Sequence, residues 1–294
     1  MRWLKSFLTL FLAVFSGLGF AAQSQEVMFD SLDGIPLKAW LFQPDDHLKP
    51  KRGTVVALHG CGGLYATVGA RKGLLNARHQ AMADMLVADG YNVVLPDSFR
   101  PRGEESICVQ PIGSRKITQR ERRADALGAL AWVAQQPWAD VQRVAVLGWS
   151  HGGSAVLAAT DSTHILIRNQ MLSHSPRFKT AIAFYPGCAD ALEGVYKPNT
   201  TLTLLLGADD DWTPPLPCVA LAKRLQTENY RVELTMYDNA VHGFDNPVGS
   251  VVERKEIPSR LHPGRGVMNG PNPEARDKAN ARVREILKEA LTSP

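Results

Sequence analysis

Hydrophobic positions along the chain fall into short continuous apolar runs that alternate with longer segments of helical periodicity. Uninterrupted runs of this length are typical of strands that are buried on both faces of a parallel sheet. Six segments carry them: 54–60, 91–97, 143–150, 179–188, 201–211 and 231–238. Helical spacing of apolar residues predicts helices over 76–89, 118–136, 151–160, 215–229 and 274–291.

The chain opens with a different pattern, over residues 26–44, in which two extended runs flank the turn dipeptide Asp33-Gly34. This pattern predicts a hairpin. A hairpin followed by repeated strand–helix units predicts an α/β fold with a mainly parallel sheet and helices on both faces. Two long connections, 161–177 and 246–273, carry no clear element, and the first is either a small cap or an exposed loop.

The first residues show the pattern of a secretory signal. Arg2 and Lys5 precede an uncharged apolar run from Phe7 to Phe20, and the small residues Gly19 and Ala21 stand at a plausible cleavage position near its end. The apolar run is shorter than the roughly 20 residues that span a bilayer. We therefore expect a cleaved signal peptide over 1–24, one domain over 25–294, and export to the periplasm or medium. An uncleaved N-terminal anchor is the alternative.

Composition adds little that is specific about partners. The chain has 294 residues, 45% of them hydrophobic and 21% charged, which is the balance of a globular protein. Without the predicted signal, 31 basic residues face 29 acidic ones. No basic patch interleaved with aromatic residues is present, so nucleic-acid binding has no support. The cluster Arg120–Arg123 is interpreted as the solvated face of a helix.

The segment Gly148–Gly152 reads GWSHG and fits the pattern G-x-S-x-G. It follows a buried strand and opens a helix, which is the setting of a nucleophile elbow. Flanking glycines permit a sharp turn without a Cβ clash, so Ser150 is the candidate nucleophile. The competing interpretation is a serine that only caps the helix, which leaves the glycines unexplained.

A serine nucleophile needs a base and an orienting acid, and in this type of fold the chain order is Ser, Asp or Glu, then His. Asp209, Asp210 and Asp211 follow the strand at 202–206 and are the candidate acids, although at least one of them could cap the next helix. This chain order places the histidine base in a loop after the aspartates.

His242 lies five residues beyond Tyr237, in the loop after the last strand, and is the candidate base. His262 is the rival, but it lies far from a strand end. His164 and His174 precede the acid and break the chain order.

Two backbone N–H groups are expected to hold the oxyanion. One is that of His151, directly after the serine, and the other comes from the loop HGCGG at 59–63, where the amide of Cys61 is the expected donor. This loop could instead be a turn without a role. A phosphate-binding loop is disfavoured because the Lys and Ser/Thr of a Walker motif are missing.

Together the segments HGCGG, GWSHG, GADDDWTP and HGF resemble the α/β-hydrolase fold and, within it, the dienelactone hydrolase family. The opening at 33–44 and LPDSFRPRG at 95–103 are similar to that family too. The resemblance places the acid three residues after Gly207, at Asp210, and the base at His242. Founding members of the family carry a cysteine at the elbow, where this chain has Ser150. The resemblance therefore does not imply that this protein acts on their lactone substrate.

The chain has four cysteines, Cys61, Cys108, Cys188 and Cys218, and their spacing fits no zinc motif. Export suggests disulfides, and the sequence alone allows three pairings. The resemblance implies Cys61–Cys108 and Cys188–Cys218, because each pair then lies on loops that leave the same end of the sheet. Free buried thiols are the alternative.

These observations predict an exported serine hydrolase that acts on a small-molecule acyl substrate, an ester, a lactone or a related bond, without a metal or organic cofactor. A short peptidase of the prolyl oligopeptidase type and a non-catalytic binding protein of the same fold are the rivals. Arg100, Arg102 and Arg115 lie in or near the polar loop at 98–117. They could bind a substrate carboxylate or be ordinary surface arginines.

Overall fold

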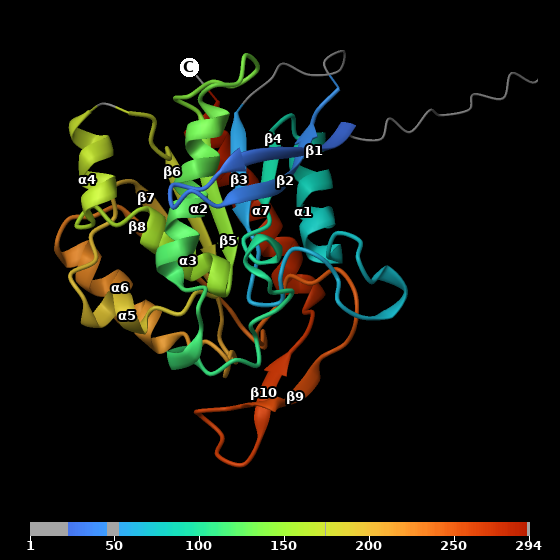
Figure 1. Cartoon of the computed structure of the whole chain (residues 1–294). Helices are drawn as coiled ribbons and strands as arrows, with labels where there is room; N and C mark the ends of the chain where they lie inside the picture. The colour runs from blue at the N-terminus through green and yellow to red at the C-terminus, as the bar shows by residue number, and fades with distance from the viewer. Residues whose placement is uncertain (1–22, 46–52, 174, 293–294) are drawn as a thin grey trace, which may run out of the picture.

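The computed structural model describes residues 23–45, 53–173 and 175–292, and a single eight-stranded sheet forms its centre (Figure 1). The strand order is β1-β2-β4-β3-β5-β6-β7-β8. Pairing is antiparallel from β1 to β4 and parallel from β4 to β8. The strands are β1 Gln23–Asp30, β2 Pro36–Gln43, β3 Thr54–Leu58, β4 Asn92–Pro96, β5 Val144–Trp149, β6 Thr180–Phe184, β7 Thr201–Gly207 and β8 Val232–Tyr237.

Helices cover both faces of this sheet, as the alternating pattern predicted. One core packs α2, α3 and α6 against one face, and a second core packs α1 and α7 against the other. Figure 1 shows α2 and α3 in front of the sheet and α7 behind it. The predicted fold class is confirmed. These helices are α1 Ala77–Ala88, α2 Gln119–Val133, α3 His151–Ala159, α6 Leu216–Thr227 and α7 Pro273–Leu291.

Local capping explains why the predicted helix limits hold to within a few residues. The Asn76 side chain accepts from the N–H of Arg78 at the start of α1, and Gly90 follows the end of α1 with φ +90°. At the start of α2, Thr118 and Glu121 form a capping box. Such caps satisfy the orphan backbone groups of helix ends and so fix where the helices begin and end.

The two long connections contain elements that the hydrophobic pattern did not indicate. The first holds α4, Ile165–Leu172, and the second holds a separate hairpin of β9 Val252–Pro258 and β10 Gly266–Asn269. In addition, α5 Ala189–Glu193 follows β6, and 3-10 turns occupy Gly69–Arg71, Arg100–Arg102 and Ile112–Ser114. Figure 1 shows the β9–β10 hairpin projecting beyond one end of the sheet.

The predicted signal peptide lies outside the described residues, apart from Gln23 and Ser24, which form the start of β1. His174 also lies outside them. Within the ranges that the structure covers, no helix is both long and apolar enough to cross a membrane.

Candidate active site

The turn between β5 and α3 carries Ser150 in an unusual backbone conformation, with φ 54° and ψ −116°. A non-glycine residue with positive φ is uncommon and marks local strain. The neighbouring glycines permit it by close approach: a Cβ on Gly148 would lie 2.3 Å from the carbonyl oxygen of Gly152, and one on Gly152 would lie 2.0 Å from that of Leu58. Ser150 stands at the N-cap position of α3, but its side chain makes no capping hydrogen bond. The interpretation of Ser150 as only a helix cap is therefore wrong.

Sheet register brings the candidate loops together. Leu58 at the end of β3 pairs with Gly148 in β5, and Trp149 pairs with Phe184 at the end of β6. Because β3, β5, β6, β7 and β8 run parallel, the loops that follow them leave the sheet at the same edge. Residues 59–63, Ser150 and the segments after β7 and β8 consequently share one end of the molecule.

Asp210 and His242 are in direct contact, with His242 Nδ1 2.8 Å from Asp210 Oδ2. The carboxylate is 1% exposed and also accepts from the backbone N–H groups of Trp212 and Thr213 and from the Thr213 hydroxyl. The His242 ring contacts the rings of Tyr185 and Trp212, each with its centroid 4.6 Å away. This packing and the hydrogen bond from the imidazole to the carboxylate fix the orientation of the His242 ring.

The rival acids and bases lie elsewhere. Asp209 is exposed, whereas Asp211 accepts from the N–H of Met268 and so holds β10. His262 is exposed on the β9–β10 hairpin, and His164 caps the start of α4. Of the candidates within the described ranges, only Asp210 and His242 pair with each other.

The loop after β3 is held by its own histidine. Ser98 N–H donates to His59 Nε2, so the proton of the neutral ring is on Nδ1, which lies 2.8 Å from the Gly60 carbonyl oxygen. Burial, with the charge of Arg122 nearby, holds the pKa of His59 well below its usual value, so the ring stays neutral. The Gly60 carbonyl also accepts from Gly63 N–H. Because the peptide is trans and planar, this arrangement directs the N–H of Cys61 the opposite way.

His151 is the first residue of α3. The first N–H groups of a helix have no partner within the helix, and they carry the positive end of its dipole. The amide of His151 is therefore suited to an anion beside Ser150.

Two disulfides border this region, and they have the pairing that the family resemblance implied. Cys61 is bonded to Cys108, and Cys188 to Cys218. The first ties the loop after β3 to the long loop at 98–117. The second ties the start of α5 to α6. Both bonds therefore join segments at the edge of the sheet where Ser150 lies.

Ser150 lines a pocket of about 380 Å³, together with Cys61 and His151. The pocket is also lined by Trp212 and by charged groups from three segments: Arg115 of the loop at 98–117, Asp190 and Glu193 of α5, and Arg260 of the β9–β10 hairpin. Of the three arginines singled out in the sequence, only Arg115 reaches it. Arg100 lies over the Tyr65 ring, and Arg102 pairs with Asp33 and Asp125.

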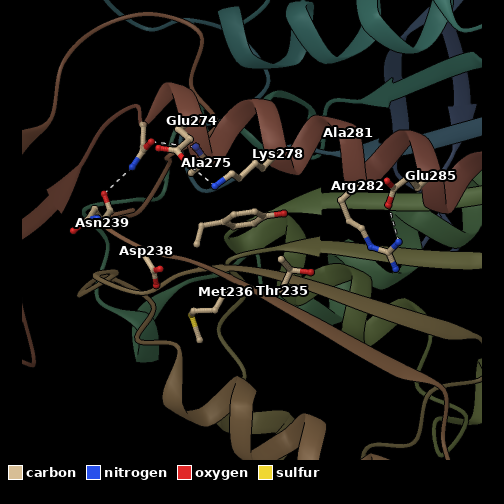
Figure 2. A pocket seen from close by; sticks show the side chains of 12 residues that line it. Thr235, Met236, Asp238, Asn239, Glu274, Ala275, Lys278, Ala281, Arg282 and Glu285 are labelled. Carbon is tan, nitrogen blue, oxygen red and sulfur yellow. Dashed lines mark hydrogen bonds and ion pairs between the residues drawn. The ribbon is translucent and has the colours of Figure 1, made fainter.

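A second pocket, of about 510 Å³, lies between β8 and α7 (Figure 2) and contains none of the candidate residues. Its cations are neutralised locally, because Lys278 pairs with Glu274, and Arg282 with Glu285 and Glu233. The pocket at Ser150, which contains candidate residues and charged groups from several segments, is therefore the candidate substrate site. Among the described residues, no group of three or more His, Cys, Asp or Glu side chains is placed to hold a metal ion.

Several groups around this site were not singled out in the sequence. Thr213 contacts both members of the acid–base pair, with its hydroxyl 3.0 Å from Asp210 Oδ2 and 3.1 Å from His242 Nδ1. The β9–β10 hairpin supplies Arg260 to the pocket, and Asn269 Nδ2 donates to the carbonyl of His242. The mixed charge pattern of the hairpin gave no signal for these contacts, because they depend on tertiary packing.

The interpretation of Arg120–Arg123 as a solvated face is wrong for Arg122, which is completely buried. Arg123 is also partly covered, since it donates to the Ala158 carbonyl. A signal was available: helical spacing places Arg122 on the same face as Ala126, Leu130 and Val133, which are buried in the core. Charge alone was therefore a poor guide to exposure in this segment.

Solved structures of similar fold include several hydrolases. A dienelactone hydrolase-like promiscuous phosphotriesterase from metagenomic libraries aligns with a TM-score of 0.64 at 17% identity, over 92% of this chain and 100% of that one. Thermogutta terrifontis esterase 2 phosphorylated by paraoxon aligns with a TM-score of 0.61 at 17% identity, over 92% and 96%. Pyrococcus horikoshii acylaminoacyl peptidase aligns with a TM-score of 0.60 at 17% identity, over 96% of this chain but only 43% of the peptidase.

Among curated proteins, the chain is 28% identical over 179 residues to a carboxymethylenebutenolidase homolog from Pongo abelii, and 27% identical over 179 residues to one from Homo sapiens. Each match covers 58% of this chain and 65% of the relative, so the chain spans slightly under two thirds of their length. The model of the dienelactone hydrolase family matches residues 37–291. Because this match covers most of the chain, the protein belongs to the dienelactone hydrolase family.

Proposed function

We propose that this protein is an exported serine hydrolase that cleaves carboxylic esters or lactones by acyl transfer. Ser150 is the nucleophile, His242 the general base and acid, and Asp210 the group that orients the imidazole. The amides of Cys61 and His151 form the oxyanion hole. The observation that carries this proposal is the 2.8 Å contact of His242 Nδ1 with buried Asp210, at the same sheet edge as the strained Ser150.

In the first half of the reaction, Ser150 Oγ attacks the acyl carbonyl while its proton passes to His242 Nε2. The carbonyl π electrons move to oxygen, and the resulting oxyanion accepts from the two amides. The tetrahedral intermediate collapses, the C–O bond of the ester breaks, and His242 protonates the leaving alcohol. Water then attacks the acyl-serine with His242 as base, and the carboxylic acid departs.

The names of similar proteins support the proposal that Ser150 accepts an acyl or phosphoryl group from the substrate. The curated relatives bear the name carboxymethylenebutenolidase homolog, and a structure of similar fold is an esterase phosphorylated by paraoxon. An organophosphate traps a serine hydrolase by forming a stable phosphoserine in place of the acyl intermediate. We therefore expect Ser150 to be labelled by a fluorophosphonate.

The direct test is hydrolysis of p-nitrophenyl acetate by the wild type and by Ser150→Ala. The variant is expected to lose activity by about 10⁴-fold or more, since the nucleophile is removed. Mass spectrometry should place the fluorophosphonate adduct on Ser150. Full activity of Ser150→Ala, or an adduct on another residue only, would refute the assignment. A wild type that is folded but inert to both reagents would favour a binding protein.

A peptidase activity is the second candidate, since an acylaminoacyl peptidase aligns over 96% of this chain. Hydrolysis of an acyl-amino acid p-nitroanilide distinguishes the two activities, because p-nitroaniline is a much poorer leaving group than p-nitrophenolate. We expect a kcat/KM for the ester that far exceeds that for the anilide. The reverse ranking would establish the peptidase.

Export rests on the predicted signal over 1–24 and is supported by the two disulfides, which are typical of oxidising compartments. Expression of the full chain in a bacterial host, followed by intact-mass measurement of the periplasmic fraction, tests it. Loss of an N-terminal segment that ends near residue 24 is expected. A full-length protein retained in the cytoplasm or membrane would contradict export by cleavage.

A further inference from the structure

A buried arginine lies behind the two loops of the proposed oxyanion hole. Arg122, in α2, is 0% exposed, and burial lowers its pKa to about 10, so it remains charged at neutral pH. Among the described residues, no carboxylate lies within ion-pair distance of it. Asp125, one turn further along α2, is instead engaged by Arg102 at 2.8 and 3.0 Å. The proposed mechanism does not use this cation.

The Arg122 guanidinium makes two polar contacts, one with each loop. Nη2 donates to the carbonyl oxygen of His59 at 2.9 Å, and Nη1 lies 3.3 Å from Nδ1 of His151. A guanidinium can only donate, so His151 Nδ1 must accept and the ring carries its proton on Nε2. Burial and the nearby charges of Arg122 and Arg115 lower the pKa of His151 to about 2, which keeps Nδ1 free to accept.

These contacts fix the peptides that flank the proposed donors. The His59 carbonyl is held by Arg122, and the next carbonyl, that of Gly60, is held by the His59 ring. Two successive peptide planes are thus oriented, and the second of them contains the N–H of Cys61. On the other side, the side chain of His151 is anchored to the same guanidinium, and His151 is the residue whose amide follows Ser150.

We infer that Arg122 is a positioning residue that cross-links the two halves of the oxyanion hole, through the His59 carbonyl in the loop after β3 and the His151 imidazole at the start of α3. This inference rests on the proposed function. Arg122 touches neither substrate nor Ser150 in this scheme. It holds the amides of Cys61 and His151 at the spacing that the tetrahedral oxyanion requires, so that little reorganisation is needed during the reaction.

A purely structural role explains the residue poorly. Burying a charge whose nearest carboxylates, Asp97 and Asp125, lie beyond ion-pair distance is unfavourable. An apolar side chain of similar volume would fill the same space against the Phe99 ring, whose centroid lies 5.2 Å from the guanidinium carbon. Residues that break such a rule are expected at functional sites. The two hydrogen bonds to opposite loops are what an apolar residue could not supply.

The test compares Arg122→Met, Arg122→Lys and the matched control Arg123→Met. Arg123 is the next residue of α2 and donates to the Ala158 carbonyl at the end of α3, so its loss disturbs α2–α3 packing without touching either oxyanion loop. For p-nitrophenyl acetate we expect Arg122→Met to lower kcat by about 10²-fold with KM within about twofold, as for a misplaced oxyanion donor. Arg122→Lys, which keeps the charge but cannot bridge both loops, should lose about tenfold. Arg123→Met should keep the wild-type kcat.

The inhibition constant of a transition-state analogue distinguishes a positioning role from general destabilisation of the fold, because destabilisation alone would not change it. An aryl trifluoromethyl ketone forms a tetrahedral hemiketal oxyanion on the serine, so its Ki should rise in Arg122→Met by about the same factor as kcat/KM falls. The Ki of the non-reactive alcohol analogue should stay constant. The pH–rate profile should keep its midpoint, because Asp210 and His242 are untouched.

The inference is overturned if Arg122→Met retains kcat, if Arg123→Met loses as much, or if the ketone Ki does not follow kcat/KM. Should Arg122→Met fail to fold, Arg122→Lys and His151→Phe carry the test, since the latter removes only the side-chain acceptor on the second loop. Wild-type kcat in both of these variants overturns the inference. Ser150→Ala distinguishes failure of the proposed function from failure of the positioning role. Full activity of Ser150→Ala refutes the proposed function. An inactive Ser150→Ala together with a fully active Arg122→Met refutes the positioning role alone.

Discussion

The imidazole of His242 and the carboxylate of Asp210 form a buried hydrogen bond of 2.8 Å between the ends of two neighbouring parallel strands. Their approach depends on Gly207, the last residue of β7. A Cβ there would lie 2.3 Å from the carbonyl oxygen of Ala240, two residues before the histidine. The contact is therefore built from a strand end, a close backbone approach and the turn that Asp210 itself caps through Trp212 and Thr213.

Asp210→Asn is expected to lower kcat for p-nitrophenyl acetate by about 10³- to 10⁴-fold while the fold is kept. An asparagine amide at the Oδ2 position would donate to His242 Nδ1 and leave the proton on Nε2, where the base is required. Asp209→Asn is the matched control, because Asp209 is exposed beside it. Comparable losses in both variants, or none in Asp210→Asn, would reject Asp210 as the orienting acid.

Removal of the Cys61–Cys108 disulfide should affect activity as well as stability. Cys108→Ala leaves the amide of Cys61 in place but frees its loop, so we expect kcat to fall by about tenfold or more, as donor alignment is lost. Cys218→Ala removes the other disulfide, which joins segments that carry no proposed oxyanion donor. Chain entropy predicts a stability loss of about 4 kcal/mol for either bond, given loops of 47 and 30 residues.

Urea unfolding and initial rates, measured on the same preparations, separate these effects. Equal losses of kcat in Cys108→Ala and Cys218→Ala would show that general destabilisation, rather than loosening of the oxyanion loop, lowers the rate.

Buried neutral histidines should make the protein sensitive to acid. Burial lowers the pKa of His79 to about 3, and that of His151 to about 2, from the usual value near 6.5. The unfolded chain then binds more protons than the folded one below about pH 6.5, so stability is complete above that pH and declines as the pH falls toward 3. Each histidine contributes a slope of up to about 1.4 kcal/mol per pH unit.

Urea unfolding at a series of pH values between neutrality and pH 4 measures this slope. His79→Asn, which can keep the hydrogen bond to the Leu64 carbonyl, should flatten it. An unchanged slope in this variant would show that His79 is not among the groups responsible.

Arg115 is expected to favour substrates that carry a carboxylate. It lines the pocket beside Ser150 and is held there by the carbonyls of Gln110 and Cys108. Arg115→Gln should raise KM for a mono-p-nitrophenyl dicarboxylate by about tenfold, the scale of one charge-assisted hydrogen bond, with little change for the neutral acetate ester. Arg100→Gln, at an arginine that lies over Tyr65, should change neither value. A uniform effect on both esters would contradict a carboxylate-binding role for Arg115.

Much of the fold could be predicted because its parallel strands are buried on both faces. Each of β3, β4, β5 and β6 is buried along its whole length and is marked by an apolar run. Capping residues such as Asn76 and Thr118 set the helix limits locally. The β9–β10 hairpin was missed for the opposite reason, since β9 is exposed or half-buried throughout and has a mixed charged sequence.

For the site, chain order and strand ends led to Ser150, His242 and a run of three aspartates. The sequence could not choose among the aspartates without the family resemblance, because Asp209, Asp210 and Asp211 are chemically identical and adjacent. Their different directions separate them: one side chain is exposed, one meets His242, and one holds Met268 of β10.

The amino-acid sequence by itself determined the order of strands and helices, the glycine-permitted turn at Ser150 and the chain order of the candidate triad, because these depend on local backbone preferences and hydrophobic periodicity. Only the tertiary structure decided which aspartate meets His242, which arginine reaches the pocket and which two segments the buried Arg122 joins. Those contacts join residues between 29 and 63 positions apart. A side chain's environment at such separations is set by how the elements pack, which no local pattern records.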